Sequence, residues 1–369
     1  YRVLERSGDR MSDGYRVPGL PDGMAAFPGP DGTVILMRNH ELSARAASGP
    51  YPVGQAPPEA YDAEAMGGVT RVVLDGTTFE RRSSNLVLTG TIRNCAGGPS
   101  PWGWLSCEET TNPGHGWVFA CDPLATRVQA PVLIRGYGRY SHEAAAVDPE
   151  TLTCYLTEDE RQSCLYRFVP RSRETPFEGQ LQALRVVGRS RFDTSAMAVG
   201  ESVTVDWVDV DPDPAGTTPG AQGRSQGAAN FVRGEGIWYF QGAVYICSTS
   251  GGPVAGGQIF RLVLGRDGAA STLELLAQST DRARLDMPDN IAVAPWGDVF
   301  MAEDGAGEQY LRILQADGRV VDFARNAGSG SELAGVCFSP DGRALFVNAQ
   351  RDGLTFVVTG PFPAVPGGG

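Results

Sequence analysis

The chain alternates short apolar runs with turn residues, and helical stripes of apolar residues are scarce. Gly and Pro interrupt nearly every window that is long enough for a helix. Runs rich in Val, Ile, Leu and aromatic residues, separated by turn chemistry, dominate instead. The pattern therefore predicts an all-β protein built from short strands.

One unit recurs six times: a short apolar strand, a turn rich in Pro, Asp or Gly, and a second apolar strand. Turns such as PDG, PWG and QG are hairpin signals. The copies are MAAFPGPDGTVILMRNHE from Met24, PSPWGWLSCEE from Pro99, EAAAVDPETLTCYLTEDE from Glu143, GEGIWYFQGAVYICSTS from Gly234, DNIAVAPWGDVFMAEDG from Asp289 and ELAGVCFSPDGRALFVNAQ from Glu332. Six irregularly spaced hairpins predict a six-bladed β-propeller with long loop insertions, formed by residues 1–369 as a single domain.

Acidic residues stand at matched places in this unit, just before its first strand or just after its second. These two points meet at one end of a hairpin, so we expect the acids to share one face. If the strands are the inner ones of each blade, the acids ring the central channel. The candidate metal ligands are Glu41, Glu108, Glu109, Glu143, Glu158, Asp159, Glu235, Asp289, Glu303, Asp304 and Glu332, with Asn290 beside Asp289.

Crowded carboxylates raise one another's pKa, and multivalent cations relieve their repulsion. Hard oxygen ligands of this kind suit calcium. Cys107, in the segment SCEE, adds a different donor, because a thiolate suits iron or zinc better than calcium. The alternative is that Cys107 is a small buried residue at the end of a strand, and that each acid is a solvated loop end.

Two further residue types refine the chemistry. The chain has only three histidines, too few for a zinc site built from several of them, and we favour supporting or structural roles for His40 and His142. Arg233 lies two residues before Glu235, and residues two apart in an extended segment point the same way. Its guanidinium suits a clamp for a phosphoryl group, and an ion pair that only holds the acids is an equal alternative.

Composition limits the partners. The chain has 31 basic and 43 acidic residues, a formal net charge of −12, and such a surface repels nucleic acid and anionic lipid. No apolar run approaches the roughly 20 residues of a membrane helix. The chain begins at Tyr1 without a signal-like segment, which fits a processed protein, and we expect a periplasmic or secreted monomer.

The seven cysteines are an odd number. Cys154 and Cys164 flank a hairpin and are candidates for a disulfide, which only geometry decides. The alternative is that most of the seven are buried free thiols.

The motifs together resemble the PhoX-type alkaline phosphatases, a family of secreted bacterial propellers. The resemblance runs from Asn39 to about Asp352 and is carried by NHE, NCAGGPSPWGWLSCEE, SHEAAAVDP, LTEDE, RGEG, MPDN, EDG and ELAGVCFSPDG. It implies a phosphomonoesterase with a mixed cluster of Fe³⁺ and Ca²⁺ in the channel. It also implies that Cys107 and Glu235 bind iron and that Arg233 contacts phosphate.

We therefore predict metal-dependent hydrolysis of a small phosphate ester, with catalytic roles for Cys107 as an iron ligand and for Arg233 at the phosphoryl oxygens. Two alternatives stay open. PDN and the later ED also resemble the gluconolactonase and paraoxonase propellers, which are calcium-dependent lactonases, and Cys107 is then structural. The other is a propeller that binds a partner or glycan, with calcium as a structural pin.

Overall fold

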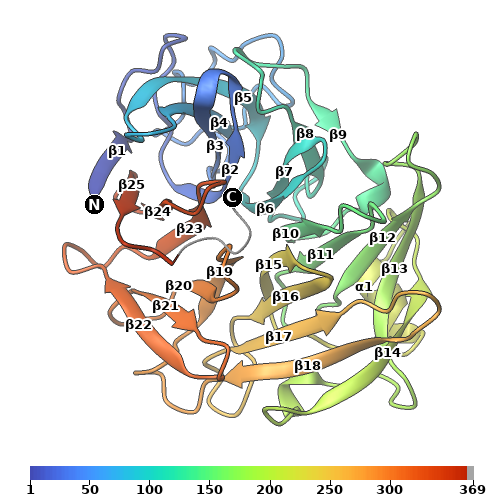
Figure 1. The fold of residues 1–369 in the computed structure, drawn as a ribbon. Helices are drawn as coiled ribbons and strands as arrows, with labels where there is room; N and C mark the ends of the chain where they lie inside the picture. Colours follow the sequence, from blue (N-terminus) through green and yellow to red (C-terminus); the bar gives the residue numbers. More distant parts are fainter. Residues whose placement is uncertain (364–369) are drawn as a thin grey trace.

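The computed structural model describes residues 1–363, and in them 25 β-strands are arranged around a central axis (Figure 1). One short helix, α1 (Pro219–Ser225), lies outside the sheets. No helix in this described part of the chain is long and apolar enough to span a membrane. The structure therefore agrees with the predicted all-β propeller-like fold.

The strands form five antiparallel sheets, and within each sheet the first hairpin strand lies nearest the axis (Figure 1). The first two sheets are β2 (Pro21–Pro28), β3 (Thr33–His40), β4 (Gly67–Asp75) and β5 (Arg81–Thr91), then β6 (Asn94–Ser100), β7 (Gly103–Glu108), β8 (Val118–Cys121) and β9 (Val132–Leu133). The last two are β19 (Pro288–Val293), β20 (Val299–Glu303), β21 (Tyr310–Leu314) and β22 (Val320–Arg325), then β23 (Leu333–Phe338), β24 (Ala344–Ala349), β25 (Leu354–Thr359) and β1 (Arg2–Arg6).

The remaining sheet has nine strands and contains both the third and the fourth predicted hairpins. Its strands are β10 (His142–Val147), β11 (Cys154–Glu158), β12 (Tyr166–Pro170), β13 (Gly179–Val186), β14 (Ser202–Asp209), β15 (Gly234–Phe240), β16 (Ala243–Ser248), β17 (Gln258–Val263) and β18 (Ser271–Gln278). The strand β14 joins its two halves, because it pairs with β13 on one side and with β18 on the other. The described residues thus form five sheets where the sequence predicts six separate blades.

The strands nearest the axis pack backbone against backbone. A Cβ atom at Gly23 would meet the backbone of Ala96, and one at Gly236 would meet the backbone of Asp289. A Cβ at Gly98 would collide with the carbonyl of Ala145. Small residues in these strands therefore narrow the channel below the end at which the strands begin.

This packing also corrects the predicted start of the second hairpin. The sequence places that start at Pro99, whereas β6 already begins at Asn94 and includes Cys95. Gly97 and Gly98 interrupt the apolar pattern that would predict a strand here. They are needed there because neighbouring backbones approach so closely.

Hydrophobic clusters fill the spaces between adjacent sheets. One cluster joins Leu36 and Val72 of the first sheet with Phe346 and Val357 of the last. All seven cysteines are buried and free, so the candidate disulfide between Cys154 and Cys164 does not form. The structure agrees instead with the expectation of buried thiols.

The N-terminal strand closes the ring of sheets. β1 pairs with β25 and so completes the sheet that contains the C-terminal strands. The carboxylate of Glu5 on β1 is fully buried and accepts hydrogen bonds from Arg38 (2.7 Å) and Ser84 (2.6 Å), with Arg81 at 2.7 Å. These three donors belong to the first sheet, so one buried anion ties the two ends of the ring together.

Replacing this anion is expected to destabilise the fold strongly. Glu5→Ala leaves the buried Arg38 guanidinium without its charge partner, which costs about 3–5 kcal/mol in free energy of unfolding. The exposed pair of Glu64 with Arg45 provides the control, because Glu64→Ala removes an ion pair worth about 0–1 kcal/mol. Urea denaturation of both variants is the measurement, and equal losses would show that Glu5 does not close the ring.

Candidate metal centre

The six hairpins begin with the same backbone arrangement. In each of them the first residue after the second strand donates its N–H to the carbonyl of the residue immediately before the first strand, at 2.9 to 3.2 Å. Each first strand then carries a register shift, a β-bulge, near its beginning. Bulges redirect side chains, so this arrangement turns selected side chains toward the axis.

This arrangement defines three equivalent positions in each hairpin, which we call the entry, bulge and exit positions. The entry position is the residue immediately before the first strand: Leu20, Arg93, Ser141, Arg233, Met287 and Glu332. The bulge position is the first residue of the register shift: Asp22, Cys95, Glu143, Glu235, Asp289 and Gly335. The exit position is the first residue after the second strand: Glu41, Glu109, Asp159, Thr249, Asp304 and Gln350.

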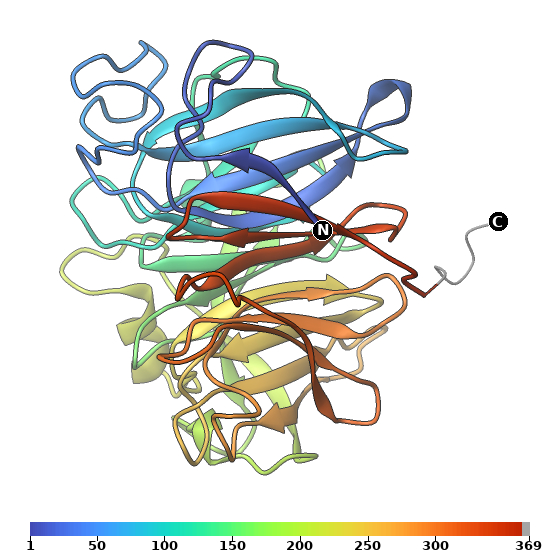
Figure 2. The same ribbon diagram turned by 90° about the vertical axis from the view of Figure 1, so that its left-hand side faces the viewer.

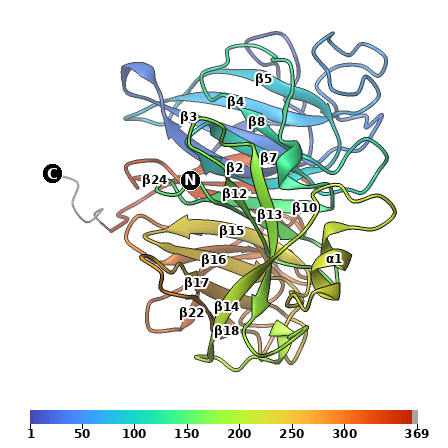
Figure 3. The ribbon, with the colours of Figure 1, turned by 90° about the vertical axis from the view of Figure 1, so that its right-hand side faces the viewer.

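A cavity of about 100 Å³ lies where these positions converge, and all 14 residues that line it are entry, bulge or exit residues. They include nine carboxylates, one thiol and two arginines. The segment between β3 and β4, which begins with the exit residue Glu41, lies on the same side of the sheets as the helix α1 in both side views (Figure 2) (Figure 3). The fold therefore concentrates acids at one end of the channel.

Three arginines each bridge two of these carboxylates. Arg93 contacts Glu41 at 2.9 Å and also Glu109. The other bridges are Arg233 with Asp159 (2.8 Å) and Glu235 (2.9 Å), and Arg351 with Glu332 (2.7 Å) and Asp304 (3.5 Å). Asp22, Glu143 and Asp289 form no ion pair with an arginine among residues 1–363.

Glu143 is the least compensated of the acids. Both of its carboxylate oxygens are buried and have no hydrogen-bond partner among residues 1–363. Burial, reinforced by Asp289 and Glu109, raises the pKa of Glu143 well above its usual value. An ionised carboxylate in such a place is costly unless a positive charge compensates it, so the site is suited to a cation.

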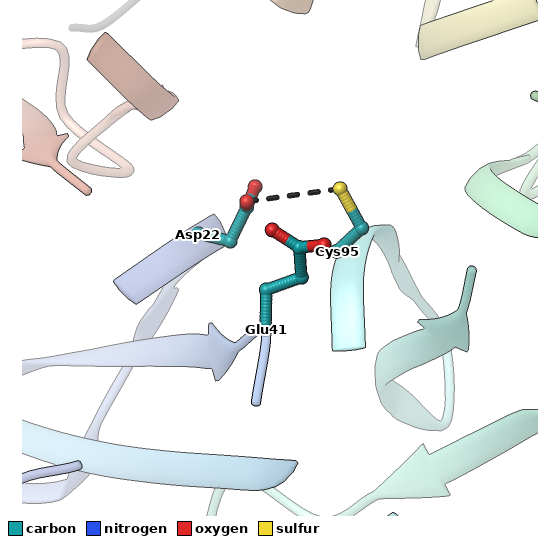
Figure 4. Close-up of side chains that lie close together, drawn as sticks. All are labelled: Asp22, Glu41 and Cys95. Carbon is teal, nitrogen blue, oxygen red and sulfur yellow. Dashed lines mark hydrogen bonds between the residues drawn. The ribbon is translucent and has the colours of Figure 1, made fainter. Parts of the chain in front are cut away.

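Three overlapping groups of side chains provide ligand atoms that lie within 4.8 Å of one another. The groups are Asp22, Glu41 and Cys95; Cys95, Glu109 and Glu143; and Glu143, Glu235 and Asp289. Figure 4 shows the first group, in which the Sγ atom of Cys95 lies 3.7 Å from Oδ2 of Asp22. Cys95 and Glu143 each belong to two groups, so the donors form a continuous series across the cavity.

The donor set combines one sulfur with many carboxylate oxygens and contains no histidine. Burial and the surrounding acids raise the pKa of the Cys95 thiol well above its usual value. The thiolate therefore requires a bound cation. Thiolate together with carboxylate suits iron, and the remaining oxygens suit calcium.

The structure brings most of the sequence candidates into this cavity. They are Glu41, Glu109, Glu143, Asp159, Glu235, Asp289, Asp304 and Glu332, together with Arg233. Glu108, Glu158 and Glu303 do not line it. Each of these three ends a second strand, one residue before the exit position, so its side chain points to the other side.

The three excluded acids have other partners. Glu108 accepts hydrogen bonds from His115 (2.6 Å) and from three backbone N–H groups. Glu158 accepts from the hydroxyl of Tyr166 at 2.7 Å, and Glu303 accepts from the guanidinium of Arg312 at 3.0 Å. These acids therefore connect their strands to neighbouring strands and loops outside the cavity. Asn290 lies in the channel below and accepts a hydrogen bond from the N–H of Gly335.

Cys107 does not line this cavity, although the sequence prediction places it at the centre of the acids. It is fully buried in a hydrophobic cluster with Leu105, Val118 and Leu156. The cysteine in the cavity is Cys95, twelve residues earlier in the same motif. Cys95 gave no signal in the sequence because the predicted second hairpin begins at Pro99, whereas β6 begins at Asn94.

Sequence reasoning also missed Asp22, Arg93, Thr249 and Gln350. Asp22 and Cys95 are the second residues of β2 and β6, as Glu143 is the second residue of β10. Aligning the units on the start of the first strand, rather than on the turn, reveals both. Thr249 and Gln350 give no such signal, because they occupy exit positions without being acids.

The two histidines next to cavity acids have structural roles. The ring of His40 is buried, with Nδ1 2.9 Å from the carbonyl of Gly19 and Nε2 2.8 Å from the hydroxyl of Thr70. The ring of His142 stacks on Tyr140 with centroids 3.6 Å apart. Neither ring lines the cavity, so both support neighbouring backbone rather than bind a ligand there.

Comparison with known proteins provides a family and a fold. The family model described as alkaline phosphatase PhoX matches residues 1–353. A search of curated proteins found no match.

Among solved structures, the chain is similar to PhoX of Pseudomonas fluorescens in complex with vanadate, a transition state analogue. The TM-score is 0.70 and the identity is 21%, over 94% of this chain and 89% of that one. The gluconolactonase XC5397 of Xanthomonas campestris matches with a TM-score of 0.50 and 12% identity, over 97% of both chains. At these identities the two structures support the fold alone.

The stability of the metal-free protein is expected to fall as pH rises. Burial raises the pKa of Asp289 to about 7, that of Glu109 to about 8 and that of Glu332 to about 9. Unfolding returns these groups to a pKa of about 4. Between pH 5 and 9 the folded state therefore binds more protons than the unfolded state, and stability is lost through that window.

Melting temperatures of chelator-treated protein at pH 5, 7 and 9 measure this effect. We expect the melting temperature to decrease with each step and the Glu332→Gln variant to show a shallower decrease. A melting temperature that stays constant across this range would contradict the charge distribution described for the cavity.

Proposed function

The chain belongs to the alkaline phosphatase PhoX family, whose members hydrolyse phosphate esters, and from that premise we propose that it acts on small phosphomonoesters with an iron–calcium cluster in the cavity. The observation that carries this proposal is the buried carboxylate of Glu143, which has no hydrogen-bond partner among residues 1–363 and lies within ligand distance of Cys95. A cation there compensates Glu143 and stabilises the thiolate at once.

We assign the iron-binding sulfur to Cys95 in place of Cys107. Cys95 is the one thiol of the cavity lining, and with Glu109 and Glu143 it offers both soft and hard donor atoms. Glu235 and Asp289 extend the donor series, and the remaining carboxylates suit calcium. When bound, such a cluster supplies Lewis acidity toward phosphoryl oxygens and lowers the pKa of the attacking water.

Arg233 is suited to bind the phosphoryl group. Its Nε and Nη2 atoms each donate to Asp159 at 2.8 Å, which fixes the plane of the guanidinium. Nη2 is also shared with Glu235, whereas Nη1 has no partner within residues 1–363. A guanidinium oriented by carboxylates and with a free N–H can donate to a non-bridging oxygen and stabilise the charge that develops on it.

We further interpret the fold as a single six-bladed domain. The strands β10–β13 and β15–β18 count as two blades, since each run begins with its own entry, bulge and exit residues. We propose that the enzyme works as a monomer in the periplasm or outside the cell. This placement follows the resemblance of its motifs to secreted phosphatases.

Phosphate esters are preferred over lactones as substrates. The family match extends over residues 1–353, whereas the similarity to a gluconolactonase concerns the fold alone. The cavity also contains a thiol and two arginines, Arg93 and Arg233, which suit iron and an anionic substrate. Hydrolysis of a neutral lactone at a calcium ion requires neither a thiol ligand nor an arginine.

Cys95→Ala is expected to lose iron and activity together. Removing a ligand should lower kcat with p-nitrophenyl phosphate by at least about 100-fold. Cys107→Ala is the matched control, because it removes a buried thiol of the same motif that lies in a hydrophobic cluster, and it should keep both metal and activity. Elemental analysis and hydrolysis rates, with and without chelator, measure the two effects.

Two results would contradict the proposal. One is full phosphatase activity in an iron-free Cys95→Ala protein. The other is a wild-type protein that contains calcium without iron and hydrolyses lactones but no phosphate esters, which would favour the lactonase alternative.

A further inference from the structure

Arg93 occupies the same position in its hairpin as Arg233. Both are entry residues, and each accepts a backbone hydrogen bond from the exit residue of its own hairpin: Glu109 to Arg93 at 2.9 Å and Thr249 to Arg233 at 3.0 Å. Their φ angles are 50° and 53°, in the left-handed region. The backbone therefore presents the two side chains to the cavity in the same way.

Arg93 also has unused donors. Its contacts with Glu41 and Glu109 both involve Nη2 alone. Its Nε and Nη1 atoms make no hydrogen bond within residues 1–363, and its side chain is 46% exposed while it lines the cavity. Arg93 is thus anchored at one nitrogen and keeps two N–H-bearing nitrogens for a ligand.

The charge distribution places the two arginines on either side of one hairpin. Glu109, the partner of Arg93, is close enough to Asp159, the partner of Arg233, for their charges to interact. Between them lies Ser141, whose carbonyl accepts the N–H of Asp159 at 3.2 Å. The cavity lining contains nine carboxylates and two basic side chains, Arg93 and Arg233. An anion bound in the cavity therefore receives its charged hydrogen bonds from these two arginines.

We propose that Arg93 is a second phosphate-binding residue, which donates from Nε or Nη1 to a non-bridging oxygen of the phosphoryl group that Arg233 also contacts. The inference rests on the proposed function and adds a residue to its substrate site. Two guanidiniums suit the dianionic phosphate of a monoester, which offers more charged oxygens than a diester does. The interaction forms in the ground state and with the product phosphate, so it acts mainly on affinity.

The alternative is a purely structural role, in which Arg93 only orients the carboxylates of Glu41 and Glu109 for metal binding. Arg351 tests this alternative, because it bridges Asp304 and Glu332 in the same manner. Arg351 is 62% exposed and does not line the cavity. The two arginines therefore share the bridging of carboxylates and differ in their access to a bound anion.

The experiment compares metal-loaded wild type with Arg93→Met, Arg93→Lys and Arg351→Met. The dissociation constant of inorganic phosphate is measured by calorimetry, KM and kcat with p-nitrophenyl phosphate, and iron and calcium by elemental analysis. In Arg93→Met we expect both the dissociation constant and KM to rise by about tenfold or more, with a smaller change in kcat and no loss of metal. Arg93→Lys should recover part of the affinity, and Arg351→Met should stay within about twofold of wild type.

The proposal is overturned by unchanged phosphate affinity in Arg93→Met, by affinity lost in proportion to metal, or by an equal loss in Arg351→Met. If Arg93→Met does not fold, Arg93→Lys decides: affinity equal to wild type overturns the second contact, and intermediate affinity with full metal content supports it. Failure of the proposed function is separate, since the wild type itself would then neither bind phosphate nor hydrolyse the ester.

Discussion

The hydrogen bond from the exit N–H to the entry carbonyl is the constraint on which the site depends. It recurs in all six hairpins and fixes the end of each second strand against the start of the first. The bulge that follows redirects one side chain toward the axis in five of the hairpins, and in the sixth the bulge residue is Gly335. Because the inner strands pack backbone to backbone through residues such as Gly23 and Gly236, the channel is narrow and the redirected side chains meet in one cavity.

This constraint produces an electrostatic conflict that the protein resolves in two ways. Carboxylates brought together by the backbone repel one another, and burial adds to the cost. Around the rim, Arg93, Arg233 and Arg351 bridge pairs of acids with permanent positive charge. At the centre Glu143 has no such partner, so a bound cation is the compensation that remains. The acids that no arginine neutralises are therefore the ones most available to bind cations.

The sequence predicted the repeated hairpins and the face that the acids share, because both follow from local alternation and turn residues. It failed where one residue of register mattered. Glu108 and Glu109 are adjacent, yet only Glu109 lines the cavity, since neighbouring positions at a strand end face opposite sides. Cys95 was missed because glycines conceal its strand. The joining of β14 to β18 depends on a pairing between distant segments, which no local pattern indicates.

The six hairpins share one backbone arrangement but differ in the residues at equivalent positions. The two sides of the cavity therefore differ in chemistry. Three consecutive entry positions hold Arg93, Ser141 and Arg233, and the other three hold Met287, Glu332 and Leu20. Both arginines of the cavity lining therefore lie on one half of the mouth, among its carboxylates. An anionic group is favoured over the first half, next to Cys95 and Glu143, where the donor set best suits a metal ion. In the proposed function, a phosphate that Arg93 and Arg233 both contact lies toward the hairpins β6–β7, β10–β11 and β15–β16, and the rest of the substrate lies away from them.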